Sequence, residues 1–457
     1  MENKHIHLIG IGGISMSGIA QILVEQNFKV TGSDLNYNKM IDKLINKEIE
    51  ISIGHSADNV KGADLVVYSS AIPENNVELK YARKHGIPVM KRAQFIARLM
   101  NDKKGIAISG THGKTTTTAL ISSLLKKGGL DPTILLGGQL GDIGNAYNGN
   151  GEYFVTEADE SDGSLLYFDP DIVIVTNIEL DHHEYYNNKE ELLSVFGEFV
   201  NKVPKNGKAI LYCEDNNIQN LVNNNNFNQL TYGLHKGAIR AVDINLLPFG
   251  SYFTVKYNQK RLGEINLQIP GKYNIKNALA AIATGMFVGL SFGKIKEIIE
   301  SFTGVKRRFE KIGLLDDILV VDDYAHHPTE IKETLKAAKN TGYQRLIAVF
   351  QPHLYSRTKH LLDEFSRSFA LVDKLIITDI YGAREDPMKG VNSRKLVNLI
   401  KKNSDTEVEY IKSFSDIIKY LKTILQPKDL FLTIGAGDVY KIGEQLVKEA
   451  KDEMVRR

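Results

Sequence analysis

Short apolar runs alternate with stretches of helical periodicity through most of this chain. In the N-terminal part, the apolar runs lie at positions 6–9, 29–31, 64–68 and 88–90. This alternation is typical of parallel strands connected by helices, because such strands are buried on both faces and read as continuous apolar runs. The pattern predicts a parallel α/β domain over residues 1–103.

The same alternation recurs twice further along the chain. Residues 104–304 form a second block, with strand patterns beginning at Ile106 and at 153–156, 172–176 and 209–212, and helical patterns at 274–288 and 294–302. Within this block, residues 238–269 lack helical periodicity and predict several antiparallel strands. Residues 305–457 form a third block, with strand patterns at 318–321, 346–350, 375–378 and 430–434. Three domains also agree with a length of 457 residues, which is too long for one ordinary core.

The composition excludes several classes of partner. Lysine and arginine (57) nearly balance aspartate and glutamate (55), so no overall field favours nucleic acid or an anionic membrane. Cys213 is the only cysteine, so no internal disulfide forms. No long uncharged apolar run predicts a membrane-spanning helix, and the first residues do not read as a signal peptide. We expect a cytoplasmic enzyme without nucleic-acid partners or membrane insertion.

A glycine-rich turn follows the first apolar run of the second block. Its sequence is Gly-Thr-His-Gly-Lys-Thr-Thr at 110–116, and a helical pattern follows it. A strand, a glycine turn and a helix start build a phosphate cradle, because backbone amides and the helix dipole converge on phosphate oxygens. We expect Lys114 to contact the β and γ phosphates of ATP and Thr115 to bind Mg²⁺. The match to the P-loop signature is incomplete, since Ile108 occupies its first glycine position, and Gly-Lys-Thr is also a common helix start.

The first strand of the chain ends in a second glycine motif. Residues 10–18 read Gly-Ile-Gly-Gly-Ile-Ser-Met-Ser-Gly, close to the dinucleotide fingerprint except that Ser15 replaces its third glycine. Asp34 closes the second strand, where a ribose-binding carboxylate is expected. The motif predicts a nucleotide pyrophosphate on the amides of Gly12 and Gly13. A tight turn without a ligand is the alternative.

Acidic residues and histidines follow two strands of the second block. Glu-Ala-Asp-Glu-Ser-Asp occupies 157–162, and Asn-Ile-Glu-Leu-Asp-His-His occupies 177–183. Parallel strands deliver such residues to one edge of the sheet. The same edge carries the glycine-rich turn at 110–116, which we call the phosphate turn. We expect Glu157 and His182 to bind Mg²⁺ beside ATP, against the alternative of solvated acidic loops.

Two further groups lie in the third block. Arg307 and Arg308 form either a solvated basic turn or a source of positive charge for ATP phosphates, in the manner of an arginine finger. His353, Tyr355 and Arg357 follow the strand ending at Phe350, and their spacing suits a small carboxylate substrate.

Together these motifs resemble the Mur ligases, in particular the branch that adds the first amino acid of the peptidoglycan stem peptide. The resemblance covers the whole chain in order. It is carried by the motifs at 10–18, 110–116, 157–162 and 177–182, by Asn274 and Asn277, and by the motifs at 307–309, 322–330 and 350–353.

The resemblance implies an α/β protein of three domains: an N-terminal Rossmann-like domain for a UDP-sugar, a central P-loop ATPase domain and a C-terminal Rossmann-like domain. It implies that ATP contacts Gly110, Thr111, His112, Gly113, Lys114, Thr115, Thr116, Asn274, Asn277, Arg308 and Asp323, and that Mg²⁺ is bound by Thr115, Glu157 and His182. For the UDP-sugar it implies Gly10, Gly12, Gly13, Ser15, Asp34 and Ser69, and for the amino acid His353, Tyr355 and Arg357. Lys114, Glu157, His182 and Arg308 are then the catalytic residues.

The implied reaction joins L-alanine to the lactyl carboxylate of UDP-N-acetylmuramate. ATP first phosphorylates the carboxylate, and the amine then attacks the acyl phosphate, so no protein nucleophile is needed. His182 and His353 are candidates for the base that deprotonates the amine. Two departures from the family pattern matter. Leu354 stands where this branch often has arginine, and glutamates 190, 191 and 198 occupy the region where later ligases carry a carbamylated lysine, so we expect no such modification.

Three alternatives stay open. The chain could be the salvage ligase that attaches an intact tripeptide to the same UDP-sugar, although its N-terminal glycine motif differs from the one here. The first domain could instead belong to a nicotinamide-dependent oxidoreductase, or the chain could bind ATP for regulation without turnover. We expect a monomer or a weak homodimer.

Overall fold

The computed structural model describes residues 4–456, except for positions 142, 182–184, 187, 225–226 and 384. By their internal contacts, the residues separate into two compact units. The first comprises Met1–Glu179, Glu190–Arg240 and Asn277–Ile298, and the second comprises Leu180–Lys189, Ala241–Lys276 and Ile299–Arg457. The predicted domain boundaries near residues 103 and 304 stay a prediction.

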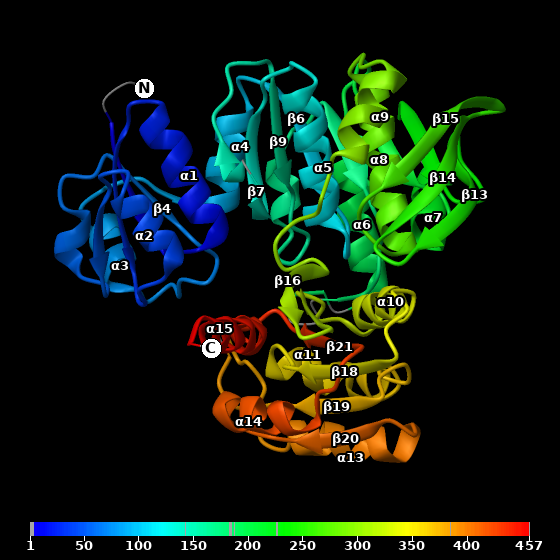
Figure 1. Cartoon of the computed structure of the whole chain (residues 1–457). Helices are drawn as coiled ribbons and strands as arrows, with labels where there is room; N and C mark the ends of the chain where they lie inside the picture. The colour runs from blue at the N-terminus through cyan, green and yellow to red at the C-terminus, as the bar shows by residue number, and fades with distance from the viewer. Residues whose placement is uncertain are drawn as a thin grey trace. The chain divides into compact units, whose positions relative to one another are not determined.

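A parallel five-stranded sheet forms the N-terminal part of the first unit, coloured blue in Figure 1. Its strand order is β3-β2-β1-β4-β5. Its elements are β1 (His5–Ile9), α1 (Ile14–Glu25), β2 (Lys29–Asp34), α2 (Lys39–Ile45), β3 (Glu50–Ile53), the short helix η1 (Ala57–Val60), β4 (Leu65–Tyr68), α3 (Val77–Lys84), β5 (Val89–Lys91) and α4 (Arg92–Met100). The strand order reverses between β1 and β4, which is where such sheets bind ligands. Gly10 and Ser69 follow these two strands, so the predicted nucleotide-sugar residues lie at the switch point.

A second sheet in the same unit carries the phosphate turn. From β12 its strands run β12-β11-β10-β6-β9-β7-β8, and the pairing is parallel except between β7 and β8. Its strands are β6 (Lys104–Ser109), β7 (Thr133–Leu140), β8 (Gly144–Tyr147), β9 (Tyr153–Glu157), β10 (Ile172–Val175), β11 (Lys208–Tyr212) and β12 (Gln229–Gly233), and the helices of this region are α5 (Lys114–Lys127), the short helix η2 (Ser164–Tyr167), α6 (Lys189–Asn201) and α7 (Asn216–Asn224). The central strand β6 lies between β10 and β9, so the loops after these three strands open at one edge.

The antiparallel segment predicted over 238–269 forms three strands. They are β13 (Ile239–Leu247), β14 (Gly250–Tyr257) and β15 (Lys260–Leu267), and they are followed by α8 (Lys272–Phe287) and α9 (Phe292–Glu300). β14 and β15 are antiparallel, as predicted, whereas β13 begins parallel to β12. The prediction of a mostly parallel fold with a small antiparallel part is confirmed.

The second unit contains a six-stranded sheet in the order β16-β17-β21-β18-β19-β20, parallel except for the edge strand β16. Its elements are β16 (Glu310–Leu315), β17 (Ile318–Asp323), α10 (Pro328–Lys339), β18 (Arg345–Phe350), α11 (Tyr355–His360), α12 (Leu362–Ser366), β19 (Lys374–Ile377), α13 (Ser393–Asn403), β20 (Glu407–Tyr410), α14 (Phe414–Ile424), β21 (Asp429–Ile434) and α15 (Tyr440–Arg456). Neighbouring strand residues pack on opposite faces. Val321 belongs to a core that includes α10 and α13, and Val320 to a core that includes α14 and α15. Helices therefore cover both faces, the arrangement that a parallel sheet requires.

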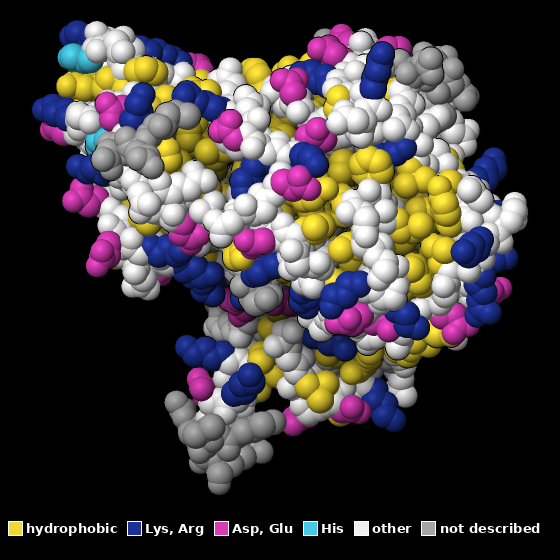
Figure 2. Space-filling view, turned by 90° about the horizontal axis from the view of Figure 1, so that it is seen from above, with side chains coloured by type: hydrophobic (Ala, Val, Ile, Leu, Met, Phe, Trp, Pro, Cys, Tyr) yellow, Lys and Arg dark blue, Asp and Glu magenta, His cyan; other side chains and the backbone are white. Residues whose placement is uncertain are grey.

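Two further observations agree with the sequence analysis, one on surface charge and one on the helices. On the face shown in Figure 2, acidic and basic side chains are interspersed, which fits their near-equal numbers. Within the described part of the chain, no helix is both long and apolar enough to span a bilayer.

Candidate active site

Two glycines of the phosphate turn have conformations that other residues rarely adopt. Gly110 follows β6 with φ +127°, and Gly113 has φ +83° at the N-cap of α5. A Cβ atom on Gly110 would lie 2.2 Å from Thr176 Oγ1, and one on Gly113 would lie 2.7 Å from Asn277 Oδ1. Close approach by Thr176 and Asn277 thus requires glycine at both positions, and the shortened motif still forms a strand, turn and helix start.

The Lys114 side chain folds back over the turn. Its Nζ donates to the Gly110 carbonyl at 2.7 Å and lies 2.9 and 2.8 Å from the two Glu160 carboxylate oxygens. Burial opposes the charge on Lys114, but the carboxylates of Glu160, Asp159 and Glu157 outweigh this effect and raise its pKa to about 12. Lys114 is therefore a charged ammonium inside the phosphate turn. Sequence reasoning placed Glu160 in an acidic motif but did not identify it as the partner of this lysine.

Two of the predicted metal ligands lie next to each other. Thr115 Oγ1 donates to Glu157 Oε2 at 3.2 Å, and the Gly137 amide donates to Glu157 Oε1 at 2.8 Å. A hydroxyl and a carboxylate are hard oxygen donors of the kind that Mg²⁺ prefers, so these side chains fit the predicted ion. His182, the third predicted ligand, lies outside the described residues.

The loop after β10 is fastened to the phosphate turn. The His112 amide donates to Asn177 Oδ1 at 2.9 Å, and His112 Nε2 lies 2.8 Å from Glu179 Oε2. Thr111 Oγ1 donates to the Glu179 carbonyl at 3.0 Å. The expectation that this motif and the phosphate turn meet at one edge of the sheet is therefore correct. The side chains of Asn177 and Glu179 contribute contacts that sequence spacing did not reveal.

The two asparagines predicted near ATP fall in different units. Asn277 Oδ1 accepts a hydrogen bond from Thr117 Oγ1 at 3.2 Å, which joins α8 to α5 beside Gly113. Asn274 belongs to the second unit, where its Nδ2 donates to the Pro270 carbonyl at 2.7 Å. The structure thus places Asn277 beside the phosphate turn, whereas the ATP contact of Asn274 stays a prediction.

The basic turn before β16 is highly structured. Arg307 Nε donates to Asp322 Oδ2 at 3.0 Å, its Nη2 donates to the Gly435 carbonyl at 2.7 Å, and its guanidinium lies over the rings of Tyr324 and Tyr440. Asp322 is fully buried. A solvated basic turn therefore does not describe Arg307, because its guanidinium is an internal structural group.

Asp323 shapes the same turn. Its Oδ2 accepts from the Phe309 amide and its Oδ1 from the Ala325 amide, both at 2.8 Å. Burial raises the pKa of Asp323 to about 6, although the charge of Arg308 opposes the shift. Arg308 lies over the Tyr324 ring, 4.9 Å from its centroid. Asp323 thus fixes the backbone directly after Arg308, and a direct contact with ATP stays a prediction.

The predicted amino-acid residues gather at the start of α11. Arg357 is 6% exposed, and its Nε and Nη2 lie 3.2 and 3.1 Å from the two carboxylate oxygens of Asp181. Its Nη1 lies 3.1 Å from His353 Nδ1. The His353 ring stacks on Tyr381 at 5.8 Å and meets His326 edge-on at 5.8 Å.

These contacts change the expectation for Arg357. Its guanidinium already faces a protein carboxylate, that of Asp181. Asp181 belongs to the same motif as His182. Sequence reasoning missed Asp181, His326 and Tyr381 at this position, since they lie far from Arg357 along the chain. Binding of a substrate carboxylate by Arg357 stays a prediction. Tyr355 begins α11 and is partly exposed, and Leu354 before it is buried at φ +66°.

The N-terminal glycine motif is held by hydrogen bonds within the protein. The Gly12 amide donates to Asp34 Oδ2 at 2.9 Å, and the Gly13 amide donates to the Gly10 carbonyl at 3.1 Å. Both amides have acceptors within the protein in this structure, and their binding of a pyrophosphate stays a prediction. Asp34 closes the loop through Oδ2, and its contact with a ribose stays a prediction. Ser69 lies beside Gly10, where an added Cβ would be 3.3 Å from the Ser69 Cβ, and Ser15 lies in the first turn of α1.

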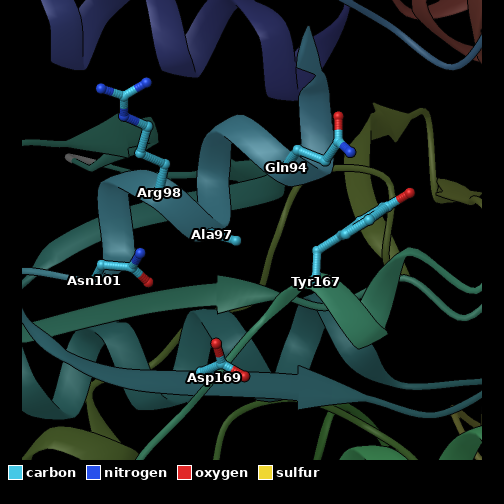
Figure 3. Close-up of a pocket in the computed structure, with 6 residues that line it drawn as sticks. All are labelled: Gln94, Ala97, Arg98, Asn101, Tyr167 and Asp169. Atoms are coloured by element: carbon cyan, nitrogen blue, oxygen red, sulfur yellow. The ribbon is translucent and has the colours of Figure 1, made fainter.

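A separate hollow of about 420 Å³ lies beside α4 (Figure 3). It is lined by Gln94, Ala97, Arg98, Asn101, Tyr167 and Asp169. None of these residues was predicted to bind a substrate, and they come from α4 and from the segment around η2.

Family models match three consecutive parts of the chain. The model described as Mur ligase family, catalytic domain, covers residues 5–104, the Mur ligase middle domain covers 108–285, and the Mur ligase, glutamate ligase domain, covers 307–437. The order and extent of these matches follow the three sheets of the structure.

Relatives match over nearly their whole length. The UDP-N-acetylmuramate–L-alanine ligase of Clostridium acetobutylicum is 48% identical over 450 residues, which cover 98% of each chain. The enzyme of the same name from Geotalea uraniireducens is 45% identical over 455 residues, 99% of each chain.

Solved structures share the architecture. The UDP-N-acetylmuramate–alanine ligase of Thermotoga maritima matches with a TM-score of 0.86 at 29% identity, over 98% of this chain and 99% of that one. A murein peptide ligase of Psychrobacter arcticus matches with a TM-score of 0.75 at 27% identity, over the same shares. The resemblance found in the motifs is thus confirmed along the full length, and the chain belongs to the Mur ligase family.

Proposed function

We propose that this chain is an ATP-dependent ligase that joins L-alanine to the lactyl carboxylate of UDP-N-acetylmuramate in peptidoglycan precursor synthesis. The observation that carries the proposal is the phosphate turn, in which a charged Lys114 and the Thr115–Glu157 pair lie at the end of β6. Relatives named for this reaction, at 45% to 48% identity over nearly the whole chain, support the choice of substrates.

The chemistry requires activation of a carboxylate. A carboxylate is a poor electrophile, so its oxygen first attacks the γ-phosphorus of ATP, the bond to the β–γ bridging oxygen breaks, and ADP leaves. The alanine amine then attacks the acyl carbon, and phosphate leaves from the tetrahedral intermediate. Lys114 provides a fixed positive charge for the transferring phosphoryl group, because its high pKa keeps it protonated at neutral pH.

The Thr115 hydroxyl and the Glu157 carboxylate would hold Mg²⁺, with His182 as a third ligand. When bound, the ion supplies additional positive charge beside the phosphates. The Gly137 amide orients Glu157 by binding its other oxygen, so that carboxylate is held in one position. Fixed positions of this kind favour catalysis, because no reorganisation is needed when charge develops.

We assign the remaining substrates to the other two sheets. The N-terminal sheet would bind the UDP-sugar at its switch point, through Gly10, Gly12, Gly13, Ser15, Asp34 and Ser69. Arg308 would supply charge to the ATP phosphates, and His353, Tyr355 and Arg357 would contact L-alanine. The proposal includes a cytoplasmic location and a monomer or weak homodimer.

The salvage reaction is the second candidate, because a murein peptide ligase shares the fold at a TM-score of 0.75. A ligation assay with L-alanine and with the tripeptide as alternative acceptors separates the two candidates. We expect product with L-alanine. Product with the tripeptide alone would assign the chain to salvage. The family assignment gives no support to a nicotinamide-dependent oxidoreductase.

The proposed function is tested by phosphate release with each substrate omitted in turn. We expect release only when ATP, UDP-N-acetylmuramate and L-alanine are all present, together with one amide product per phosphate. Phosphate release that does not depend on either acceptor would contradict the proposal and favour a regulatory ATP-binding protein.

A further inference from the structure

A buried carboxylate to which no role has been assigned above packs against the N-terminal sheet. Glu78, in the first turn of α3, has a fully buried side chain. Its partners come from separate elements, and we call this group the Glu78 cluster. It comprises Glu78, His7, Ser33, His55 and Asn59.

The contacts of Glu78 occupy both of its oxygens. Oε2 accepts from Ser33 Oγ at 2.6 Å, lies 3.1 Å from His55 Nδ1 and lies 3.8 Å from His7 Nε2. Oε1 accepts from Asn59 Nδ2 at 2.6 Å and from the Ser56 amide at 3.3 Å. Across the residues that the structure describes, no lysine or arginine forms an ion pair with this carboxylate. The cluster therefore holds a buried carboxylate with hydroxyl, amide and imidazole groups alone.

Glu78 remains ionised in this setting. Burial would favour the protonated acid, but the nearby His7 imidazole and hydrogen bonds from Ser33 and Asn59 outweigh it and hold the pKa at about 2. A buried charge without a strong cation is costly, and apolar side chains of similar volume usually stabilise a core at least as well. Departures of this kind from the ordinary rules of core packing are expected where function requires them.

One partner of Glu78 leads directly to the glycine motif. The Ser33 carbonyl accepts hydrogen bonds from the Gly10 amide at 2.8 Å and from the Ile11 amide at 3.1 Å. Asp34, the next residue, holds the Gly12 amide at 2.9 Å. The end of β2 thus determines the path of residues 10–12.

The fit between β2 and this loop is close. A Cβ atom on Gly32 would lie 2.4 Å from Ile11 Cδ1, and one on Gly12 would lie 2.6 Å from Asn38 Nδ2 and 2.9 Å from Asp34 Oδ2. A small displacement of β2 would therefore displace the loop as well, because close-packed groups transmit strain. Among the described partners of Glu78, Ser33 alone has both a side chain bound to Glu78 and a backbone carbonyl bound to the loop.

We propose that Glu78 is a positioning residue for the nucleotide-sugar site, which it holds in its binding conformation through Ser33 and the end of β2. This inference rests on the proposed function, because it takes the glycine motif as part of the UDP-N-acetylmuramate site. Glu78 itself touches no substrate in this scheme. It acts by fixing the loop at residues 10–12 before the substrate arrives, which reduces the cost of ordering on binding.

The test compares Glu78→Gln with Glu74→Gln in the full-length protein. Gln at 78 keeps the volume but replaces one acceptor oxygen with an amide nitrogen, whereas Glu74 lies on the same domain with a side chain 65% exposed. We expect Glu78→Gln to raise the KM for UDP-N-acetylmuramate about tenfold and to leave kcat and the KM values for ATP and L-alanine within about twofold. Glu74→Gln is expected to match the wild type.

Ser33→Ala is an independent test. It removes the hydroxyl that donates to Glu78 and leaves Glu78 itself unchanged. It should raise the same KM, and the double variant should add little to either single change, because both act on one link. If Glu78→Gln does not fold, Ser33→Ala alone decides the question.

Two results would overturn the inference. One is a KM for UDP-N-acetylmuramate within about twofold of wild type in the folded Ser33→Ala and Glu78→Gln variants. The other is an equal rise of all three KM values, which would assign Glu78 a purely structural role. Titration of the wild-type protein with UDP-N-acetylmuramate separates these results from failure of the proposed function. If the wild type does not bind that compound, the proposed function is wrong; if it binds and the variants bind equally well, only the inference is wrong.

Discussion

The Lys114 ammonium and the Glu160 carboxylate form a buried charged pair, with Nζ 2.9 and 2.8 Å from the two carboxylate oxygens and Glu160 only 2% exposed. The pair connects the start of α5 to the loop after β9. Phosphate oxygens bound at this turn would compete with Glu160 for the same ammonium. Without bound phosphate, the pair with Glu160 keeps Lys114 charged and holds its ammonium at the turn where phosphoryl transfer is proposed.

Lys114→Ala should abolish ligation and leave UDP-N-acetylmuramate binding nearly intact. Loss of the cation beside the transferring phosphoryl group should lower kcat about a hundredfold or more. Steady-state phosphate release measures the rate, and calorimetric titration measures UDP-sugar binding. Lys127→Ala, at an exposed position near the end of the same helix, is the control. Turnover by Lys114→Ala within a few-fold of wild type would show that the phosphate turn is wrongly assigned.

Arg307→Ala and Arg308→Ala should differ in kind. Arg307→Ala leaves the buried Asp322 carboxylate without its cation and should lower the free energy of unfolding by about 3 kcal/mol. Arg308→Ala should lower kcat and leave stability within about 0.5 kcal/mol, because its proposed role is toward ATP. Chemical denaturation followed by circular dichroism gives the stabilities. Equal losses of stability in the two variants would contradict this division.

Arg357→Ala should affect both stability and the use of L-alanine. Removing the guanidinium takes the Arg357 cation away from the buried Asp181 carboxylate, which should cost about 3 kcal/mol. The KM for L-alanine should rise while those for ATP and the UDP-sugar stay within a few-fold. The double variant Asp181→Ala/Arg357→Ala tests the two roles separately. It should recover much of the stability but keep the raised KM for L-alanine. If the double variant also recovers that KM, Arg357 serves only to hold Asp181.

The stability of the second unit should depend on pH through His326. Burial lowers the pKa of His326 from 6.5 to about 4, although Glu330 opposes the shift. Between pH 6.5 and pH 4, the His326 imidazole is protonated in the unfolded protein but stays neutral in the folded protein. The free energy of unfolding therefore falls as the pH drops from 6.5 to 4. The loss over this window is about 3 kcal/mol.

His326→Gln should flatten this part of the pH profile. The chain has no tryptophan, so far-UV circular dichroism in urea is the suitable probe. The difference between wild type and variant isolates His326 from other titrating groups, including Asp323, Glu330 and Asp181. Parallel pH profiles for the two proteins would show that His326 titrates normally in the folded state.

Local pattern was sufficient for the elements that carry the site. The apolar run before Gly110 becomes β6, and the segment after the glycine turn becomes α5, because a short buried run that ends in a glycine turn is typical of a strand followed by a helix start. Edge strands such as β3, β16 and β20 were not predicted. They are short or partly exposed, so their sequences carry little continuous apolar signal.

The sequence by itself determined the α/β class, the phosphate turn, the Thr115–Glu157 neighbourhood and the family, because each rests on a local strand-to-loop pattern. Only the tertiary structure decided the partners of the charged groups. Glu160 pairs with Lys114, Asp181 with Arg357 and Asp322 with Arg307, and Asp34 takes the Gly12 amide that the motif had assigned to a phosphate. These partners are separated along the chain, and parallel strand pairing, which local periodicity does not encode, determines which loops meet. A charged side chain buried by such pairing needs a partner, and the fold, not the motif, determines which one is within reach.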